Sequence, residues 1–127
     1  MSISETCPCG SQQSFSSCCK PIISGNVIAQ APEQLMRSRY SAYVNGAIDY
    51  LVDTTHSSTR KNHKRTDIEN WSKTTKWLGL EIVRSTETTV EFKARFAGDK
   101  ETVETHHEKS TFVFEDGKWY YVDGEFY

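Results

Sequence analysis

The stretch Val90-Glu91-Phe92-Lys93-Ala94-Arg95-Phe96 alternates apolar and polar side chains along its whole length. Alternation with a period of two predicts a β-strand that buries one face and leaves the other polar. The segment from Trp77 repeats this period and places Leu78, Leu80 and Ile82 on one expected face. Two neighbouring strands are therefore predicted in the middle of the chain.

Two more strands are predicted downstream, over residues 103–114 and 118–123. They are joined at Asp116-Gly117, where the glycine permits the positive φ that a tight hairpin requires. The second half of the chain thus predicts a four-stranded antiparallel meander.

Helices are predicted upstream of these strands. Pro32 suits the first position of a helix, and Glu33 is favourable near the positively polarised N-terminus of that helix. Gly46 divides the region into two helical pieces. The apolar residues that recur at helical spacing in this region are Met36, Tyr40, Tyr43, Val44 and Ala47. The second piece is expected to bury Ile48, Leu51 and Val52.

A third, short helix is predicted around Trp71. Thr66 and Glu69 have the spacing of a capping box, in which each side chain bonds a free amide of the first turn, and the helix is expected to end near Thr75. Helices followed by an antiparallel sheet indicate an α+β domain. We therefore expect about three helices packed on a curved four-stranded sheet that wraps them into a cone.

All four cysteines, Cys7, Cys9, Cys18 and Cys19, lie close together near the N-terminus. Residues 1–24 hold too few large apolar side chains to form a core of their own, so a bound metal would have to cross-link them. Four thiolates complete a tetrahedron and leave no open position, which is typical of a structural rather than a catalytic zinc site. An iron–sulfur cluster is one alternative, and a disulfide pair, which requires an oxidising compartment, is another.

The pattern Cys-Pro-Cys-Gly-Ser at residues 7–11, followed by Cys18-Cys19 after eight intervening residues, resembles the SEC-C motif. The resemblance implies that the four cysteines are the ligands of one structural Zn²⁺ and that residues 1–24 form a zinc knuckle. Serine and glutamine stand between the two cysteine pairs where the motif usually carries lysines. This difference weakens the case for contact between the knuckle and RNA.

A second resemblance rests on the segments Leu35–Tyr43, Val90–Phe96, His107–Ser110 and Trp119–Gly124. Together they are similar to the uncharacterised bacterial YchJ family. That resemblance implies a SEC-C knuckle joined to a domain of the nuclear transport factor 2 type, which has a cystatin-like fold. The expected domains are therefore residues 1–24 and residues 25–127.

The 127 residues carry a formal net charge of -2, with 36% hydrophobic and 25% charged residues. This composition is that of a globular protein, and no segment approaches the roughly 20 apolar residues of a membrane span. The N-terminus has neither the basic nor the apolar region of a secretory signal. A cytoplasmic location is expected, where thiols stay reduced.

Several polar residues stand within segments that are patterned for burial. They are Arg37 and Tyr40 on the first helix, Glu91 and Arg95 on the second strand, and Glu108 and Ser110 on the third. Because buried charges need partners, these groups would form an arginine–carboxylate network lining a pocket if their faces meet inside the cone. The alternative is that the same charges form cross-strand salt bridges on an exposed face.

His56 and His107 are the acid–base candidates if the pocket is reactive, because imidazole titrates near neutral pH. A lone histidine more often caps or packs, so no catalytic residue is assigned. His106 and His107 are not expected to form a second metal site, because neighbouring residues on a strand point in opposite directions.

The preferred hypothesis is a zinc-binding protein whose knuckle contacts a protein partner and whose sheet domain binds a partner or a small molecule. A small-molecule isomerase or hydratase that uses His56 or His107 with Glu91 or Glu108 is the alternative. Association with RNA or the ribosome through the basic residues 60–65 is a weaker alternative, because the whole chain is slightly acidic and offers no strong field for polyanions.

Overall fold

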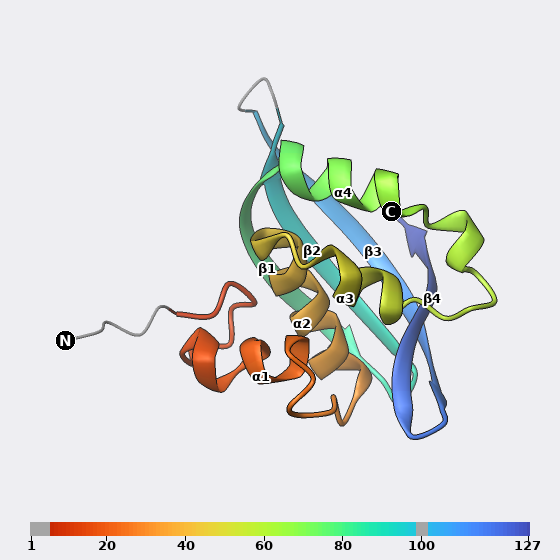
Figure 1. The fold of residues 1–127 in the computed structure, drawn as a ribbon. Helices are drawn as coiled ribbons and strands as arrows, with labels where there is room; N and C mark the ends of the chain where they lie inside the picture. The colour runs from red at the N-terminus through yellow and green to blue at the C-terminus, as the bar shows by residue number, and fades with distance from the viewer. Residues whose placement is uncertain (1–5, 99–101) are drawn as a thin grey trace.

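The computed structural model describes residues 6–98 and 102–127, and its helices cover one face of a curved sheet (Figure 1). The helical elements are η1 (Phe15–Ser17), α1 (Cys19–Ile23), α2 (Pro32–Asn45), α3 (Ile48–Asp53), η2 (Arg60–Asn62) and α4 (Arg65–Thr74). The strands are β1 (Lys76–Ser85), β2 (Thr89–Ala97), β3 (Val103–Glu115) and β4 (Lys118–Phe126). Every helix in these residues is too short or too polar to cross a membrane. The predicted α+β class is confirmed.

The four strands form one antiparallel meander in the order β1-β2-β3-β4, as the period of two predicts. β2 places Val90, Phe92 and Ala94 in the core. Asp116 and Gly117 both have positive φ, 53° and 80°, which is the geometry of a two-residue hairpin turn between β3 and β4.

The edge strand β1 departs from simple alternation. Its register against β2 shifts between Trp77 and Gly79, which leaves Leu78 as an extra residue in a β-bulge. The bulge turns Trp77 and Leu80 toward the same core cluster and leaves Leu78 46% exposed. The prediction that Leu78 shares a buried face with Leu80 and Ile82 is therefore wrong for Leu78.

The break that the sequence predicted at Gly46 separates α2 from α3. α2 begins with Pro32 in its first turn and ends where Gly46 adopts the left-handed conformation at φ 74°. Glycine enters this conformation at little cost because it has no Cβ. α3 follows, buries Ile48 and Leu51 and packs back against α2.

α4 lies across the sheet and carries Trp71 (Figure 1). The helix starts at Arg65 with Lys64 as its N-cap, and no side chain makes a capping hydrogen bond. A capping residue needs the extended backbone that Lys64 has, whereas Thr66 is already helical. The predicted capping box between Thr66 and Glu69 is therefore wrong, although the helix itself is present.

The core lies between α2 and the face of the sheet that the helices cover. Its main cluster joins Leu35 and Met36 of α2 to Phe92 and Phe112 of the sheet, and it also contains Ile22 of α1. Ile22 belongs to the knuckle, yet it is only 6% exposed inside this cluster. The knuckle and the sheet domain therefore share one core.

Candidate functional site

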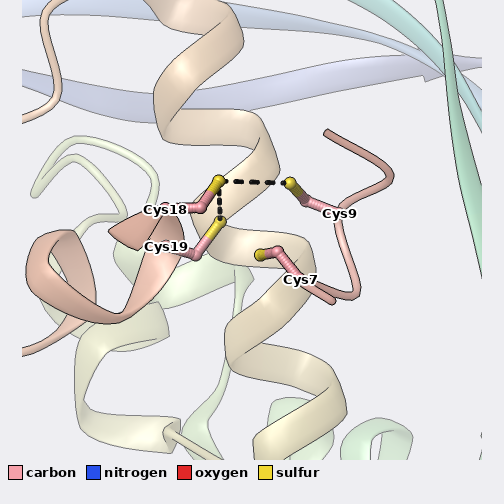
Figure 2. Close-up of side chains that lie close together, drawn as sticks. All are labelled: Cys7, Cys9, Cys18 and Cys19. Carbon is pink, nitrogen blue, oxygen red and sulfur yellow. Dashed lines mark hydrogen bonds between the residues drawn. The ribbon is translucent and has the colours of Figure 1, made fainter. Parts of the chain in front are cut away.

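The four cysteines come together from two segments of the knuckle (Figure 2). Cys7 and Cys9 lie in the loop before η1, and Cys18 and Cys19 lie where η1 passes into α1. The Sγ atom of Cys18 lies 3.7 Å from that of Cys9 and 3.9 Å from that of Cys19. All four sulfur atoms lie within 4.8 Å of one another.

This spacing fits a tetrahedral metal site. Zn–S bonds of about 2.3 Å place the sulfurs of a tetrahedron roughly 3.8 Å apart, close to the 3.7 Å and 3.9 Å separations found here. The four thiols are free, and these separations far exceed the about 2.0 Å of a disulfide bond. The four-cysteine set could therefore bind a metal ion through sulfur alone.

Hydrogen bonds and burial change how readily Cys9, Cys18 and Cys19 ionise. The bond between Cys19 and Cys9 lowers the pKa of the Cys9 thiol and raises the pKa of Cys19, and burial raises the pKa of Cys18. Ser41 of α2 places its Oγ 3.4 Å from the Sγ of Cys7. The lowered pKa favours the thiolate of Cys9, which is the form that binds a metal.

The knuckle is fastened to α2 and β1 by contacts of its cysteine loop. Arg37 of α2 donates from Nη1 to the Cys9 carbonyl at 2.6 Å and from Nε to Glu33 at 3.1 Å. Gly10 has a φ of 85°, and a Cβ there would lie 3.1 Å from the carbonyl oxygen of Leu80 in β1. A larger residue would therefore strain the loop and press it away from the sheet.

A second candidate site is a cavity of about 200 Å³ between α2, α4 and the covered face of the sheet. Its apolar lining is Met36, Tyr40, Tyr43, Ile68, Trp71, Trp77, Phe92, Ala94 and Phe126, and its polar lining is Arg39, His63, His106, Glu108, Ser110 and Tyr121. Trp71 and Trp77 meet edge to face, with ring centroids 5.3 Å apart. Aromatic walls with a few convergent polar groups are typical of small-molecule sites.

Glu108 is the centre of a hydrogen-bond network in this cavity, although its side chain is almost fully buried. Its Oε2 accepts from Ser110 Oγ at 2.6 Å and from the Tyr121 hydroxyl at 2.9 Å, and its Oε1 lies 2.8 Å from His106 Nε2. Burial by itself raises the pKa of Glu108, but the bonds from His106, Ser110 and Tyr121 outweigh it and lower the pKa below its ordinary value. Glu108 is therefore ionised at neutral pH.

Arg39 is the second buried charge of the cavity and is 5% exposed. Its Nη1 donates to the Leu51 carbonyl at 2.9 Å and to Thr54 Oγ1 at 2.6 Å, and its guanidinium carbon lies 4.6 Å from the centre of the Tyr121 ring. No ion pair within residues 6–98 and 102–127 includes Arg39. The Tyr121 ring therefore contacts the buried cation, while its hydroxyl bonds the buried anion of Glu108.

Three of the six residues predicted to line a pocket do line this cavity, namely Tyr40, Glu108 and Ser110. Arg37 was predicted to line the pocket but lies beside the cysteine loop. The arginine of α2 that lines the cavity is Arg39. A helix has 3.6 residues per turn, so side chains two positions apart point to roughly opposite sides.

Glu91 and Arg95 lie outside the cavity, on the face of β2 that the helices leave uncovered. Glu91 Oε2 lies 2.8 Å from His107 Nε2, and Arg95 Nη2 lies 3.2 Å from Glu81 Oε1. For these two residues the structure corrects the pocket prediction and matches the alternative of cross-strand ion pairs. The physical reason is the pleat, because the burial of Phe92 on one face places its neighbours on the other.

The histidines predicted as acid–base candidates also lie outside the cavity lining. His56 Nε2 lies 2.5 Å from Glu115 Oε1, and His107 lies on the outer face of the sheet. His106 lines the cavity instead. His106 shares a strand face with Glu108, two residues later, so the alternation of β3 could have predicted that His106 lines the same pocket as Glu108.

Arg39 and His63 line the cavity without having been predicted. Arg39 follows Met36 by three residues and precedes Tyr43 by four, so helical spacing could have placed it on their face. His63 comes from the loop between η2 and α4, where the sequence carries no periodic signal.

The basic residues 60–65 are partly engaged within the protein. Arg60 donates to the Thr55 carbonyl from Nε at 3.2 Å and from Nη2 at 2.9 Å. Arg65 Nη2 lies 2.6 Å from Asp49 Oδ1. Two of the basic side chains in this segment therefore have partners within the protein.

Comparison with known proteins identifies the family. Residues 31–124 match the family model described as "YchJ, middle NTF2-like domain". The chain belongs to the YchJ family. A UPF0225 protein of Geobacter sulfurreducens is 41% identical to this YchJ-family chain, over 93% of the chain and 77% of the relative.

Two solved structures of SEC-C motif containing proteins are also similar to this YchJ-family chain. The solution structure from Rhodopseudomonas palustris has a TM-score of 0.86 and 35% identity, and the match covers 94% of this chain and 97% of that one. The crystal structure from Psychrobacter arcticus has a TM-score of 0.78 and 30% identity, and the match covers 94% of this chain and 81% of that one. The predicted family and the predicted NTF2-like fold are therefore confirmed.

Proposed function

We propose that this YchJ-family protein binds a small molecule in the cavity between α2, α4 and the sheet, and that one structural Zn²⁺ cross-links the cysteines of its knuckle. The observation that carries the proposal is a cavity of about 200 Å³ in which aromatic walls surround the hydrogen-bonded carboxylate of Glu108. Burying the charges of Glu108 and Arg39 costs free energy that an apolar core avoids. Their presence in the cavity therefore favours a binding role.

Zinc is the metal that a set of four thiolates favours. Cys7, Cys9, Cys18 and Cys19 would hold the ion, which when bound supplies the cross-links that fold a segment poor in apolar residues. Four sulfur ligands leave no open position for a substrate. The proposed metal is therefore structural, and any ligand belongs to the cavity.

The cysteine cluster and the cavity are connected through α2. Arg37 holds the cysteine loop by the Cys9 carbonyl, while Arg39 and Tyr40 line the cavity. A metal that orders the knuckle would thereby fix the helix that forms one wall of the cavity. We propose that the ion has this positioning role in addition to folding the knuckle.

A protein partner is proposed for the outer surface of the knuckle, and a cytoplasmic location keeps its thiols reduced. Apart from Gly10 and Phe15, residues 10–17 are all serine or glutamine, and Gln12 and Ser16 are exposed. A photoreactive amino acid at Gln12 should give one discrete cross-linked protein in the producing cell, and removing the metal should abolish it. The same cross-linked protein from a probe at the exposed Glu87, in the turn between β1 and β2, would contradict a partner specific to the knuckle.

Ligand binding can be tested by recording ¹H–¹⁵N spectra of the zinc-loaded protein against a library of single-ring organic compounds. Binding should shift the indole signals of Trp71 and Trp77, which line the cavity. Ala94→Leu fills the cavity and should abolish these shifts, whereas Lys93→Leu on the neighbouring position of β2 should retain them. Binding that survives Ala94→Leu, or no shift with any compound, would count against the proposal.

A small-molecule enzyme is the second candidate function, and the 2.8 Å contact between His106 and Glu108 in the cavity favours it. An imidazole oriented by a carboxylate can exchange a proton with a ligand, which is the chemistry of isomerases and hydratases. Exchange of solvent deuterium into a bound ligand should then be lost in His106→Gln and kept in His107→Gln. Exchange at the rate of the free ligand would remove this candidate.

A further inference from the structure

The two buried charges of the cavity differ in how fully their hydrogen bonds are used. The Glu108 carboxylate is already bonded to Ser110, Tyr121 and His106. Arg39 uses only Nη1, and its Nε and Nη2 make no hydrogen bond to residues 6–98 or 102–127. Arg39 therefore has donors that none of these residues uses, whereas the Glu108 carboxylate already has three hydrogen-bond partners.

Arg39 also lacks a negative charge in contact with it. Its partners are the Leu51 carbonyl, two threonine hydroxyls and the Tyr121 ring, all of which are uncharged. Tyr121 lies between Arg39 and Glu108, contacting the guanidinium with its face and the carboxylate with its hydroxyl. Because a deeply buried cation is costly without an opposite charge in contact, an anionic ligand group would stabilise it.

The remaining lining sets the size and polarity of the ligand. An apolar cavity of about 150 Å³ accommodates benzene, and the cavity here measures about 200 Å³. One aromatic ring with a short side arm therefore fits between walls that include Trp71 and Trp77. The indole Nε1 of Trp77 is buried without a hydrogen-bond partner in the described residues, so it is a second donor that lacks an acceptor.

We infer that the ligand of the cavity is a small organic acid with one ring-sized apolar body, bound as its carboxylate. This inference rests on the proposed function and narrows it to one class of ligand. The carboxylate accepts hydrogen bonds from Nε and Nη2 of Arg39, because a guanidinium matches a carboxylate with two parallel bonds. An amine of the same shape would meet Arg39 with like charge, and an alcohol would leave the cation unneutralised.

Three probes of nearly equal size separate these alternatives: phenylacetate, 2-phenylethanol and 2-phenylethylamine. In NMR titrations of the zinc-loaded full chain, phenylacetate should bind at least about tenfold more tightly than the other two, as a charge-assisted pair predicts. Arg39→Lys keeps the charge but loses the paired donors, so it should weaken phenylacetate binding by about tenfold. Arg95→Lys, on the outer face, is the matched control and should leave the affinity unchanged.

A second measurement uses the unaltered chain, because Arg39 also bonds the backbone at Leu51. Nuclear Overhauser contacts between phenylacetate and the indoles of Trp71 and Trp77, together with selectivity for the acid, support the inference. Equal or tighter binding of the amine or the alcohol, or phenylacetate bound away from both indoles, overturns it and leaves the proposed function standing. Binding by none of the three probes also overturns it. The proposed function fails on its own tests, which are binding that survives Ala94→Leu or no shift with any compound of the library.

Discussion

Gly124 of β4 packs directly against the carboxylate of Glu108 on β3. A Cβ at Gly124 would overlap Oε2 and would lie 2.6 Å from Cδ and 2.7 Å from Cγ of Glu108. The φ of Gly124 is not positive, so the glycine provides space rather than an unusual backbone conformation. The missing side chain lets Glu108 reach Ser110 and Tyr121, and the polar centre of the cavity depends on it.

Gly124→Ala should lower the free energy of unfolding by about 1–3 kcal/mol, the range typical of overpacked sites. The added methyl group must push Glu108 away from its donors. Gly79→Ala is the matched control, because a Cβ at this strand glycine meets nothing within 4 Å. Urea unfolding measures both variants. If the overlap is the cause, adding Glu108→Ala to Gly124→Ala should cost less than the sum of the two single changes, and additive costs would refute this explanation.

The lowered pKa of Glu108 predicts a particular dependence of stability on pH. A carboxyl whose pKa is lower in the folded than in the unfolded protein stabilises the fold above its unfolded pKa, and this contribution is lost as the pH falls through the folded pKa. The difference in unfolding free energy between the wild type and Glu108→Gln should therefore be constant near neutral pH and shrink in acid. A difference that grows on acidification would contradict the assigned hydrogen bonds.

Replacing one cysteine should remove the metal and destabilise the protein. We expect about one zinc ion per wild-type chain by elemental analysis and nearly none in Cys9→Ser, because three sulfurs no longer close the tetrahedron. The melting temperature should fall in Cys9→Ser and after chelation of the wild type. Ser16→Ala, in the same loop, is the control and should keep both its metal and its stability. A wild type that is purified without metal, has four free thiols and keeps its melting temperature when a chelator is added would exclude a structural metal.

Ile22→Ala should destabilise the sheet domain although the residue lies in the knuckle. Removing a fully buried isoleucine side chain costs about 2–5 kcal/mol, and Ile22 is buried in the main core cluster. Ile28→Ala, at a position that is 47% exposed, should cost much less. Both values come from urea unfolding followed by tryptophan fluorescence. Equal effects would mean that the knuckle does not contribute to the shared core.

Periodicity predicted the order and type of the main helices and strands, because each element buries one face. The break at Gly46 and the hairpin at Asp116-Gly117 were predicted from the glycines themselves, and both glycines have positive φ in the structure. The bulge at Leu78 could not be predicted, since one extra residue in β1 reverses the faces of the strand without changing the pattern of residue types.

The candidate site was predicted less completely than the fold. The four cysteines could be identified from their spacing, because metal ligands must lie close together in space. Whether Arg37 or Arg39 lines the cavity depends on which side of α2 faces the sheet. Whether His106 or His107 does so depends on which face of β3 the helices cover. These differences of one or two residues follow from packing against the sheet, which the sequence determines only indirectly.

α2 contacts the cysteine loop through Arg37 and lines the cavity with Arg39 and Tyr40. With zinc as the structural ion, a newly made chain would become competent to bind its ligand only after acquiring its metal. The zinc supply of the cell would then set what share of the molecules is active, without any effector acting at the cavity itself.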